Sequence, residues 1–174
     1  MSPRLPLVLL AAGALFLPLA QYAWSYTARQ GEPAMQASVT YLHLLRKTPF
    51  FTRLTTAQLR YVIEHSTEWE VKAGQAIAGS GDADGGLWIL LDGGWQVEVA
   101  GKAYPALHDE AGKWYGGAAV QGAVLPSRLV VTRHSYVMHI SAADFASMHE
   151  QGYDFDAHMQ QGERYYGQLL RKIN

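Results

Sequence analysis

Cysteine is absent from the 174 residues of this chain. Its absence excludes disulfides, thiolate nucleophiles and every zinc site that depends on cysteine ligands, and it is compatible with the cytoplasm and with exported compartments alike. The sequence also lacks an excess of either charge, because 14 Lys and Arg against 15 Asp and Glu give a formal net charge of −1. A protein that binds a nucleic acid duplex needs clustered basic residues to neutralise phosphates, so nucleic acid is not an expected partner.

A long uncharged run stands near the N-terminus, where residues 5–24 read LPLVLLAAGALFLPLAQYAW. At ~1.5 Å per residue, a helix of this length crosses a ~30 Å hydrocarbon layer. Arg4 precedes the run, and Trp24 and Tyr26 stand at its other end, where aromatic residues favour a membrane interface. The sequence therefore predicts a transmembrane anchor within residues 1–26, with the lipid bilayer as a partner.

A cleavable signal peptide is the competing interpretation of the same segment, and it stays open. Pro18 can break the helix, and Ala23 and Ser25 are small residues at the two positions that a signal peptidase reads. The run is long for a signal peptide, which favours the uncleaved anchor. Because a short basic segment ahead of an apolar run is typical of export signals, we expect a single-pass membrane protein whose body lies on the periplasmic or extracytoplasmic side.

Residues 27–47 are predicted to form a linker and then a helix. The stretch TARQGEP, residues 27–33, breaks the apolar pattern, and Pro33 suits the first turn of a helix that runs to about Lys47. Pro49 would end that helix.

A second helix is predicted in the stretch LTTAQLRYVIEHS. Thr55 can cap its N-terminus, and Gln58 stands three residues later, at the capping-box position. Leu54 and Leu59 are spaced for a hydrophobic staple across the same helix start.

From Trp69 onward, apolar residues recur with a period of two, which is the period of a half-buried strand. The alternating residues are Trp69 and Val71, then Leu87, Ile89 and Leu91, then Trp95, Val97 and Val99, with strand character returning at 129–132 and 136–140. Glycines separate these segments at the short intervals of a barrel or sandwich. The segment SAADFASMHEQ and a helix in residues 151–174 follow. We therefore expect a mostly-β α+β fold, an antiparallel β-roll or jelly-roll barrel flanked by N- and C-terminal helices.

Surplus aromatic residues have two interpretations. Trp88 is expected on the strand face opposite Leu87 and Ile89, where it either packs in a two-sided core or anchors a partner surface. Of the neighbouring Tyr165 and Tyr166, one should be buried and the other available.

The order of motifs over about a hundred residues resembles the cyclic-nucleotide-binding domain, the β-roll of the bacterial catabolite activator and of kinase regulatory subunits. The matching segments are KTPFFTRLTTAQLRYVIEH, AGQAIAGSGDADGGLWILLDGGWQVEV and VMHISAADF. They resemble, in turn, the family's Pro-Phe-Phe and helix start, its Ala-Gly, Gly-Asp and glycine-separated strands, and its closing strand with Asp-Phe. The resemblance implies that residues 48–150 form this β-roll.

The segment KWYGGAAVQGAVLPSRLVV falls where that family keeps its phosphate-binding cassette. In the family, a Glu takes the ribose hydroxyls and an Arg pairs with the cyclic phosphate, while backbone N–H groups complete the site. This chain has Gly117 in place of the Glu and Ser127 in place of the Arg, so the cassette is degenerate. The candidate ligand-binding residues implied by the resemblance are Tyr115, Gly116, Gly117, Ala118, Ala119, Ser127 and Arg128.

The two departures from the family pattern predict that no cyclic nucleotide is held as a cofactor. Each lost charge-assisted contact removes ~1.5–3 kcal/mol, or roughly 10²- to 10⁴-fold in affinity together. Arg128 follows Ser127 directly, and adjacent strand residues point to opposite faces, so it would look away from the pocket. A one-residue shift of the turn would let Arg128 take the missing arginine's place, and this alternative stays open.

No residues with the spacing of a catalytic or metal site emerge from the sequence. The 7 His are scattered without ligand spacing, and the loop DADGG at 82–86 lacks the later ligands of a calcium loop. No Ser, His and Asp residues occur in the order of a catalytic triad near a nucleophile-elbow motif, so enzymatic activity is not expected.

Two functions remain. The first is a membrane-tethered, non-catalytic interaction or accessory subunit of a membrane protein complex, in which the roll is a scaffold that does not bind cyclic nucleotide. The second is a sensor that binds cyclic AMP or cyclic GMP through residues 115–131. The sequence names neither the partner nor the oligomeric state.

Overall fold

The computed structural model describes residues 35–40, 42–79, 85–116 and 127–173. The chain divides into two units, Met1–Pro33 and Ala34–Asn174, and the fold below is that of the second. The predicted anchor at residues 5–24 lies outside the described residues. Within the described ranges, no helix combines the length and the apolar character that a membrane crossing needs.

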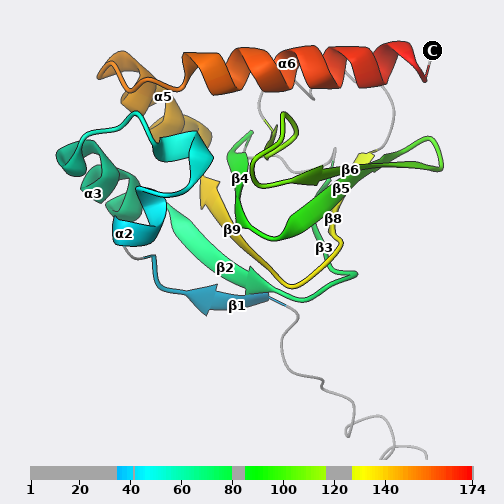
Figure 1. The fold of residues 1–174 in the computed structure, drawn as a ribbon, viewed down its shortest axis with the longest axis horizontal. Helices are drawn as coiled ribbons and strands as arrows, with labels where there is room; N and C mark the ends of the chain where they lie inside the picture. The colour runs from blue at the N-terminus through cyan, green and yellow to red at the C-terminus, as the bar shows by residue number, and fades with distance from the viewer. Residues whose placement is uncertain (1–34, 41, 80–84, 117–126, 174) are drawn as a thin grey trace, which may run out of the picture. The chain divides into compact units, whose positions relative to one another are not determined.

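Two antiparallel sheets form the body of this unit (Figure 1). The first contains, in spatial order, β1 (Met35–Ser38), β2 (Thr67–Val71), β9 (Ser135–Ile140), β4 (Leu87–Asp92) and β7 (Trp114–Gly116). The second contains β3 (Ala76–Gly79), β8 (Ser127–Val131), β5 (Gly94–Val99) and β6 (Lys102–Leu107). The expected mostly-β α+β fold with antiparallel sheets is confirmed.

The described helices lie in two groups in the chain, between β1 and β2 and after β9. They are α2 (Leu42–Leu45), the 3₁₀ turn η1 (Pro49–Phe51), α3 (Thr56–Glu64), α5 (Ala142–Glu150) and α6 (Asp156–Arg171). Figure 1 shows α2, α3 and α5 gathered at one end of the sheets, while α6 extends along the roll. At the start of α3, Thr55 Oγ1 accepts from the Gln58 amide at 3.3 Å and Gln58 Oε1 accepts from the Thr55 amide at 2.9 Å, so the predicted capping box is confirmed.

An aromatic cluster joins η1 to the two C-terminal helices. Phe50 stacks on Phe155 with ring centroids 5.3 Å apart, and Phe155 stacks on Phe145 at the same distance. Phe51 meets Phe50 edge-on at 5.2 Å. Because Phe50, Phe51 and Phe155 are fully buried, their burial stabilises the packing of η1 against the start of α6 and against α5.

Strand β4 is buried on both faces, which simple alternation did not predict. Leu87 and Ile89 are buried on one face, as expected, and Leu90 is fully buried as well. A register shift between Leu90 and Asp92 interrupts the pairing of β4 with β9. Leu90 precedes this shift and lies in regular register opposite Val137, so it is buried because both faces of β4 are covered.

The helix expected from Pro33 to Lys47 is wrong over most of its described length. Met35–Ser38 forms β1, and only Leu42–Leu45 is helical. The reason is tertiary: β1 pairs antiparallel with β2, from Met35 opposite Val71 to Ser38 opposite Glu68. This ladder satisfies backbone groups that a short helix, with its four unsatisfied groups at each end, would leave exposed.

Candidate ligand-binding site

The two described ends of the cassette lie on different sheets. β7, at the edge of the five-stranded sheet, ends at Gly116, and β8, in the four-stranded sheet, begins at Ser127. Gly117, Ala118 and Ala119 lie outside the described residues. The site is therefore defined by what Tyr115, Gly116, Ser127 and Arg128 contact.

A hydrogen bond between hydroxyl groups links the two sheets at this point. Tyr115 Oη and Ser127 Oγ are 3.0 Å apart, and the two residues are only 3% and 4% exposed. A buried hydroxyl needs a partner, because desolvation without one is costly. Ser127 thus points into the interior and contacts a side chain of the opposite sheet.

Arg128 lies on the other face of β8. It is exposed, and its Nη2 contacts Glu98 Oε2 at 2.6 Å. Glu98 lies directly opposite on β5, so the pair spans neighbouring strands. The hydrogen bonds from Arg128 and, less strongly, from Gln96 hold the pKa of Glu98 below its usual value. In this arrangement the guanidinium is directed away from the Tyr115–Ser127 bond.

Gly116 is required by a close approach of two backbones. Its φ of 125° lies in a region that other residues rarely adopt. A Cβ at this position would overlap the carbonyl oxygen of Gly86, next to the strand pair Gly116–Leu87. The glycine therefore serves the close packing of β7 against the start of β4.

Tyr115 belongs to a row of aromatic side chains across three strands. It lies opposite Trp88 on β4, and Trp88 lies opposite His139 on β9. The Trp88 and His139 rings are tilted, with centroids 4.7 Å apart. Directly opposed residues share a face, so all three belong to the face that carries the Tyr115–Ser127 bond. Trp88 packs against the core, and the register of β4 and β9 brings it together with His139, a pairing that no local sequence pattern indicates.

The residue before Tyr115 faces the opposite way and holds α6. Trp114 Nε1 donates to the His158 carbonyl at 2.9 Å, and the Tyr166 hydroxyl donates to the carbonyl of Trp114. Tyr166 is buried, and burial raises its pKa well above the usual value. The neighbouring Tyr165 is half-buried and donates to the Pro105 carbonyl at 3.3 Å. Consecutive residues of β7 thus touch the roll interior and the last helix.

Lys113, which directly precedes β7, adds a polar contact to α6. Its Nζ donates to Gln161 Oε1 at 3.2 Å and to the Glu110 carbonyl at 3.3 Å. Burial lowers the pKa of this amine, with the charge of Asp109 acting in the opposite direction.

The chemistry of the described site is that of neutral hydroxyls and aromatic rings. Such groups hold a ligand by stacking and by single hydrogen bonds, which fits binding better than bond cleavage. In the part of the chain that the structure describes, no three His, Asp or Glu side chains are grouped to hold a metal ion.

Comparison with known proteins identifies the fold. No protein-family model and no curated protein matches the sequence. The PKAR CBD2 domain with bound Sp-2Cl-cAMPS matches with a TM-score of 0.57 and 13% identity, over 76% of this chain and 88% of that one. A putative cyclic nucleotide-binding protein from Geobacter metallireducens GS-15 matches with a TM-score of 0.52 and 20% identity, over 78% and 99%.

A third similar structure has a different ligand. It is the guanosine-bound regulatory subunit of a cAMP-independent protein kinase A from Trypanosoma cruzi, with a TM-score of 0.55 and 17% identity over 76% of this chain. This chain spans 50% of that protein. Together these likenesses show that residues 35–173, where described, have the fold of a cyclic nucleotide-binding domain.

Proposed function

We propose that this chain is a non-catalytic interaction subunit of a membrane protein complex, in which a cyclic nucleotide-binding fold serves as a scaffold and the cassette binds no cyclic nucleotide. The observation that supports the proposal most strongly is the division of roles between Ser127 and Arg128. Ser127 is engaged inside the roll by Tyr115, and Arg128 is engaged outside it by Glu98.

The energetic argument concerns the cyclic phosphate. A buried phosphate needs charge-assisted donors, and each such contact is worth ~1.5–3 kcal/mol. A serine hydroxyl in the arginine's place supplies at best one neutral hydrogen bond, about 1 kcal/mol. For Arg128 to supply the missing charge, it would have to leave Glu98 and turn to the opposite face of β8, which requires a one-residue shift of the strand register.

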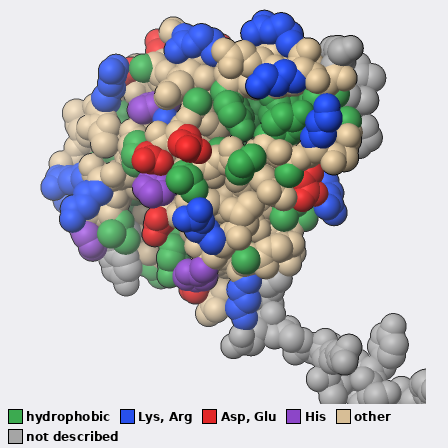
Figure 2. Space-filling view, turned by 45° about the vertical axis from the view of Figure 1, so that its right-hand side comes forward, with side chains coloured by type: hydrophobic (Ala, Val, Ile, Leu, Met, Phe, Trp, Pro, Cys, Tyr) green, Lys and Arg blue, Asp and Glu red, His purple; other side chains and the backbone are tan. Residues whose placement is uncertain are grey.

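Attachment to the membrane through residues 5–24 and an extracytoplasmic body are part of the same proposal, supported by the uncharged run and its flanks. An exported domain would rarely meet a cytoplasmic second messenger, which agrees with a degenerate cassette. The surface is suited to a protein partner rather than to nucleic acid. Figure 2 shows a face on which basic, acidic, His and hydrophobic side chains are interspersed, with no continuous basic tract on that face.

Titration of the full-length chain with cyclic AMP and cyclic GMP tests the cassette. Calorimetry should show no binding heat into the high-micromolar range. The double change Gly117→Glu and Ser127→Arg should create measurable affinity, and Gly117→Glu alone, which adds no cation, should not. Low-micromolar binding by the unmodified chain that is lost in Arg128→Ala would refute the proposal and establish the sensor function.

Fractionation and reporter fusions test the membrane part independently. The chain should stay in the membrane fraction after a carbonate wash, and a reporter that works only after export should be active when fused after residue 174. A soluble form that begins near Tyr26 would show a cleaved signal peptide instead. Activity of a cytoplasmic reporter alone would reverse the topology.

A further inference from the structure

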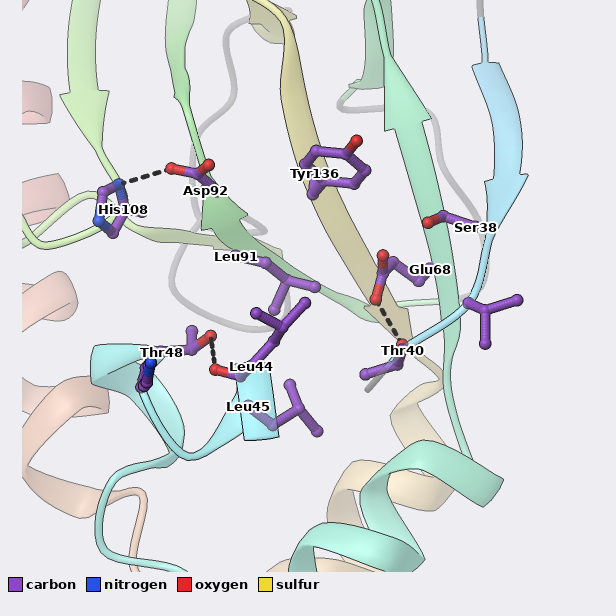
Figure 3. Close-up of a pocket in the computed structure, with 12 residues that line it drawn as sticks. Ser38, Thr40, Leu44, Leu45, Thr48, Glu68, Leu91, Asp92, His108 and Tyr136 are labelled. Atoms are coloured by element: carbon purple, nitrogen blue, oxygen red, sulfur yellow. Dashed lines mark hydrogen bonds and ion pairs between the residues drawn. The ribbon is translucent and has the colours of Figure 1, made fainter. Parts of the chain in front are cut away.

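A cavity of about 470 Å³ lies on the other face of the five-stranded sheet, away from the Tyr115–Ser127 bond. Residues of β1, α2 and the end of β4 line it, and Figure 3 shows their side chains around a common space. The face is fixed by register: Glu68 lies opposite Met138, which lies opposite Ile89, which lies opposite Trp114. Trp114 faces α6, so the cavity opens on the helical side of the sheet, not into the roll.

Two of the apolar side chains that line the cavity are unusually exposed to solvent. Val39 is 68% exposed and Leu44 is 51% exposed, and among the described residues these are the large hydrophobic side chains classed as exposed. Leu45, which is buried, and Leu91 extend the same apolar surface inward. Exposed apolar side chains that converge on one hollow favour an apolar ligand, since its burial releases water from both surfaces.

One wall of the cavity carries a buried carboxylate. Glu68 is only 8% exposed, and Figure 3 shows its carboxyl group directed between Tyr136 and Leu44. Thr40 Oγ1 donates a hydrogen bond to Glu68 Oε2 at 2.5 Å. Among the described residues, Thr40 is the hydrogen-bond partner of this carboxylate. A buried carboxylate with a single hydroxyl partner has lone pairs left to satisfy, and a cation satisfies them best.

The rim of the cavity strengthens the negative field. Asp92 lines the cavity and is mostly exposed. Its Oδ1 lies 3.6 Å from His108 Nδ1. Lys47 brings a cation to the same rim, so the two carboxylates outnumber the one ammonium group. Lys47 is exposed and keeps its hydration, whereas Glu68 has lost most of its own. The cavity therefore favours a positive group near Glu68.

We propose that this cavity binds a small organic cation with an apolar body, with its ammonium group on Glu68 and its hydrocarbon part against Leu44, Val39 and Leu91. The volume lies within the ~300–1,000 Å³ typical of small-molecule sites. The site is separate from the cassette and does not depend on the proposed function, so either can fail without the other.

Matched probes test the charge requirement on the full-length chain. Cyclohexylmethylammonium and cyclohexanecarboxylate share a ring and differ in the sign of their charge. Binding is followed through the methyl NMR signals of Leu44 and Val39 in selectively labelled protein. The ammonium should shift these signals with an affinity of about a millimolar or better, as expected for a ligand of this size. Equal or stronger binding of the carboxylate would overturn the proposal.

Substitutions locate the cation. Glu68→Gln keeps the shape of the side chain and should weaken ammonium binding about tenfold or more, since a charge-assisted hydrogen bond is lost. Leu44→Ser should weaken it about threefold or more through the lost apolar contact. Glu64→Gln removes an exposed carboxylate of α3 that does not line the cavity, and it should change nothing.

The remaining outcomes are also decisive. Unchanged affinity in Glu68→Gln, or signal shifts at methyl groups outside the cavity, would refute the site. If Glu68→Gln does not fold, as judged by its methyl spectrum, the comparison of the two probes on the unmodified chain decides alone. Acetyl-lysine-amide with a free side-chain ammonium carries the same cation on a peptide, and binding tighter than that of the free amine would assign the cavity to a protein segment instead.

Discussion

Replacing Gly162 by alanine should loosen α6 from the roll. Gly162 is buried on the face of α6 that packs against Trp114. A Cβ at this position would overlap the indole Nε1 and would lie 2.6 Å from Cζ2. Trp114 is fully buried and its Nε1 donates to the His158 carbonyl, so the ring has little room to move away.

The magnitude follows from two opposing terms. Alanine is favoured over glycine within a helix by about 0.8–1 kcal/mol. Overpacking by one methyl group in a tight contact costs about 1–3 kcal/mol, and a buried indole N–H that loses its acceptor costs about 1–3 kcal/mol more. The overlap involves the rigid part of a buried ring, so the clash should win. We expect Gly162→Ala to lower the free energy of unfolding by about 1–5 kcal/mol.

Gly167→Ala is the matched control on the same helix. Nothing lies within 4 Å of a Cβ built at Gly167. Only the helix propensity changes there, so this variant should be about 0.5–1 kcal/mol more stable than the unmodified chain. The two substitutions are chemically identical and are predicted to act with opposite sign.

Urea unfolding of the full-length chain, followed by tryptophan fluorescence and by far-UV circular dichroism, measures both variants. The reasoning fails if Gly162→Ala is as stable as Gly167→Ala, because α6 would then not be held tightly against Trp114. Coincidence of the two probes should be checked first, since a separately unfolding α6 would make a single free energy meaningless.

Two further predictions concern ionisable groups. Burial, followed by the charges of Lys113 and Arg53, lowers the pKa of His158 in the folded protein. The folded state therefore favours the neutral ring, and the free energy of unfolding should fall as the pH drops below about 6.5, the pKa of His in the unfolded chain. His158→Gln should flatten that part of the dependence of the unfolding free energy on pH, and an unchanged slope would contradict the assignment. Because the hydrogen bond from Arg128 is the main cause of the lowered Glu98 pKa, Arg128→Ala should raise that pKa toward its ordinary value, as measured by NMR titration of the carboxyl carbon. No change would mean that Arg128 leaves Glu98 in solution.

Local chemistry explains which elements could be predicted from the sequence. The Thr55–Gln58 capping box acts within one turn, so its signal is complete in four residues, and the structure has it. The alternation of Trp95, Val97 and Val99 was equally readable, and all three are buried in β5. Tyr166 is the buried member of its pair, in agreement with helical spacing.

Elements that depend on distant partners were missed. β1 has only four residues, too few for the alternation of Met35, Gln36, Ala37 and Ser38 to identify a strand, and it forms by pairing with the edge of β2. β6 contains Pro105, which argues against a central strand, and it is found at the edge of the four-stranded sheet, where proline is tolerated. The Tyr115–Trp88–His139 row depends on the register of three strands, which no local pattern specifies. The same holds for the cavity at Glu68, where residues from β1, α2, β2, β4, β9 and the segment after β6 converge.

The contacts around β7 bear on the proposed scaffold function. In a sensor, the ligand must bind two arrangements of the protein with different affinity, because a ligand without that difference shifts nothing. Here α6 is held in place by hydrogen bonds within the chain, from Trp114 to His158, from Tyr166 to Trp114 and from Lys113 to Gln161. None of these bonds involves Tyr115, Gly116, Ser127 or Arg128, the described candidate ligand-binding residues. We infer that the roll holds its last helix in place without a ligand, which is the property that a scaffold for a partner protein needs and that a nucleotide switch would have to give up.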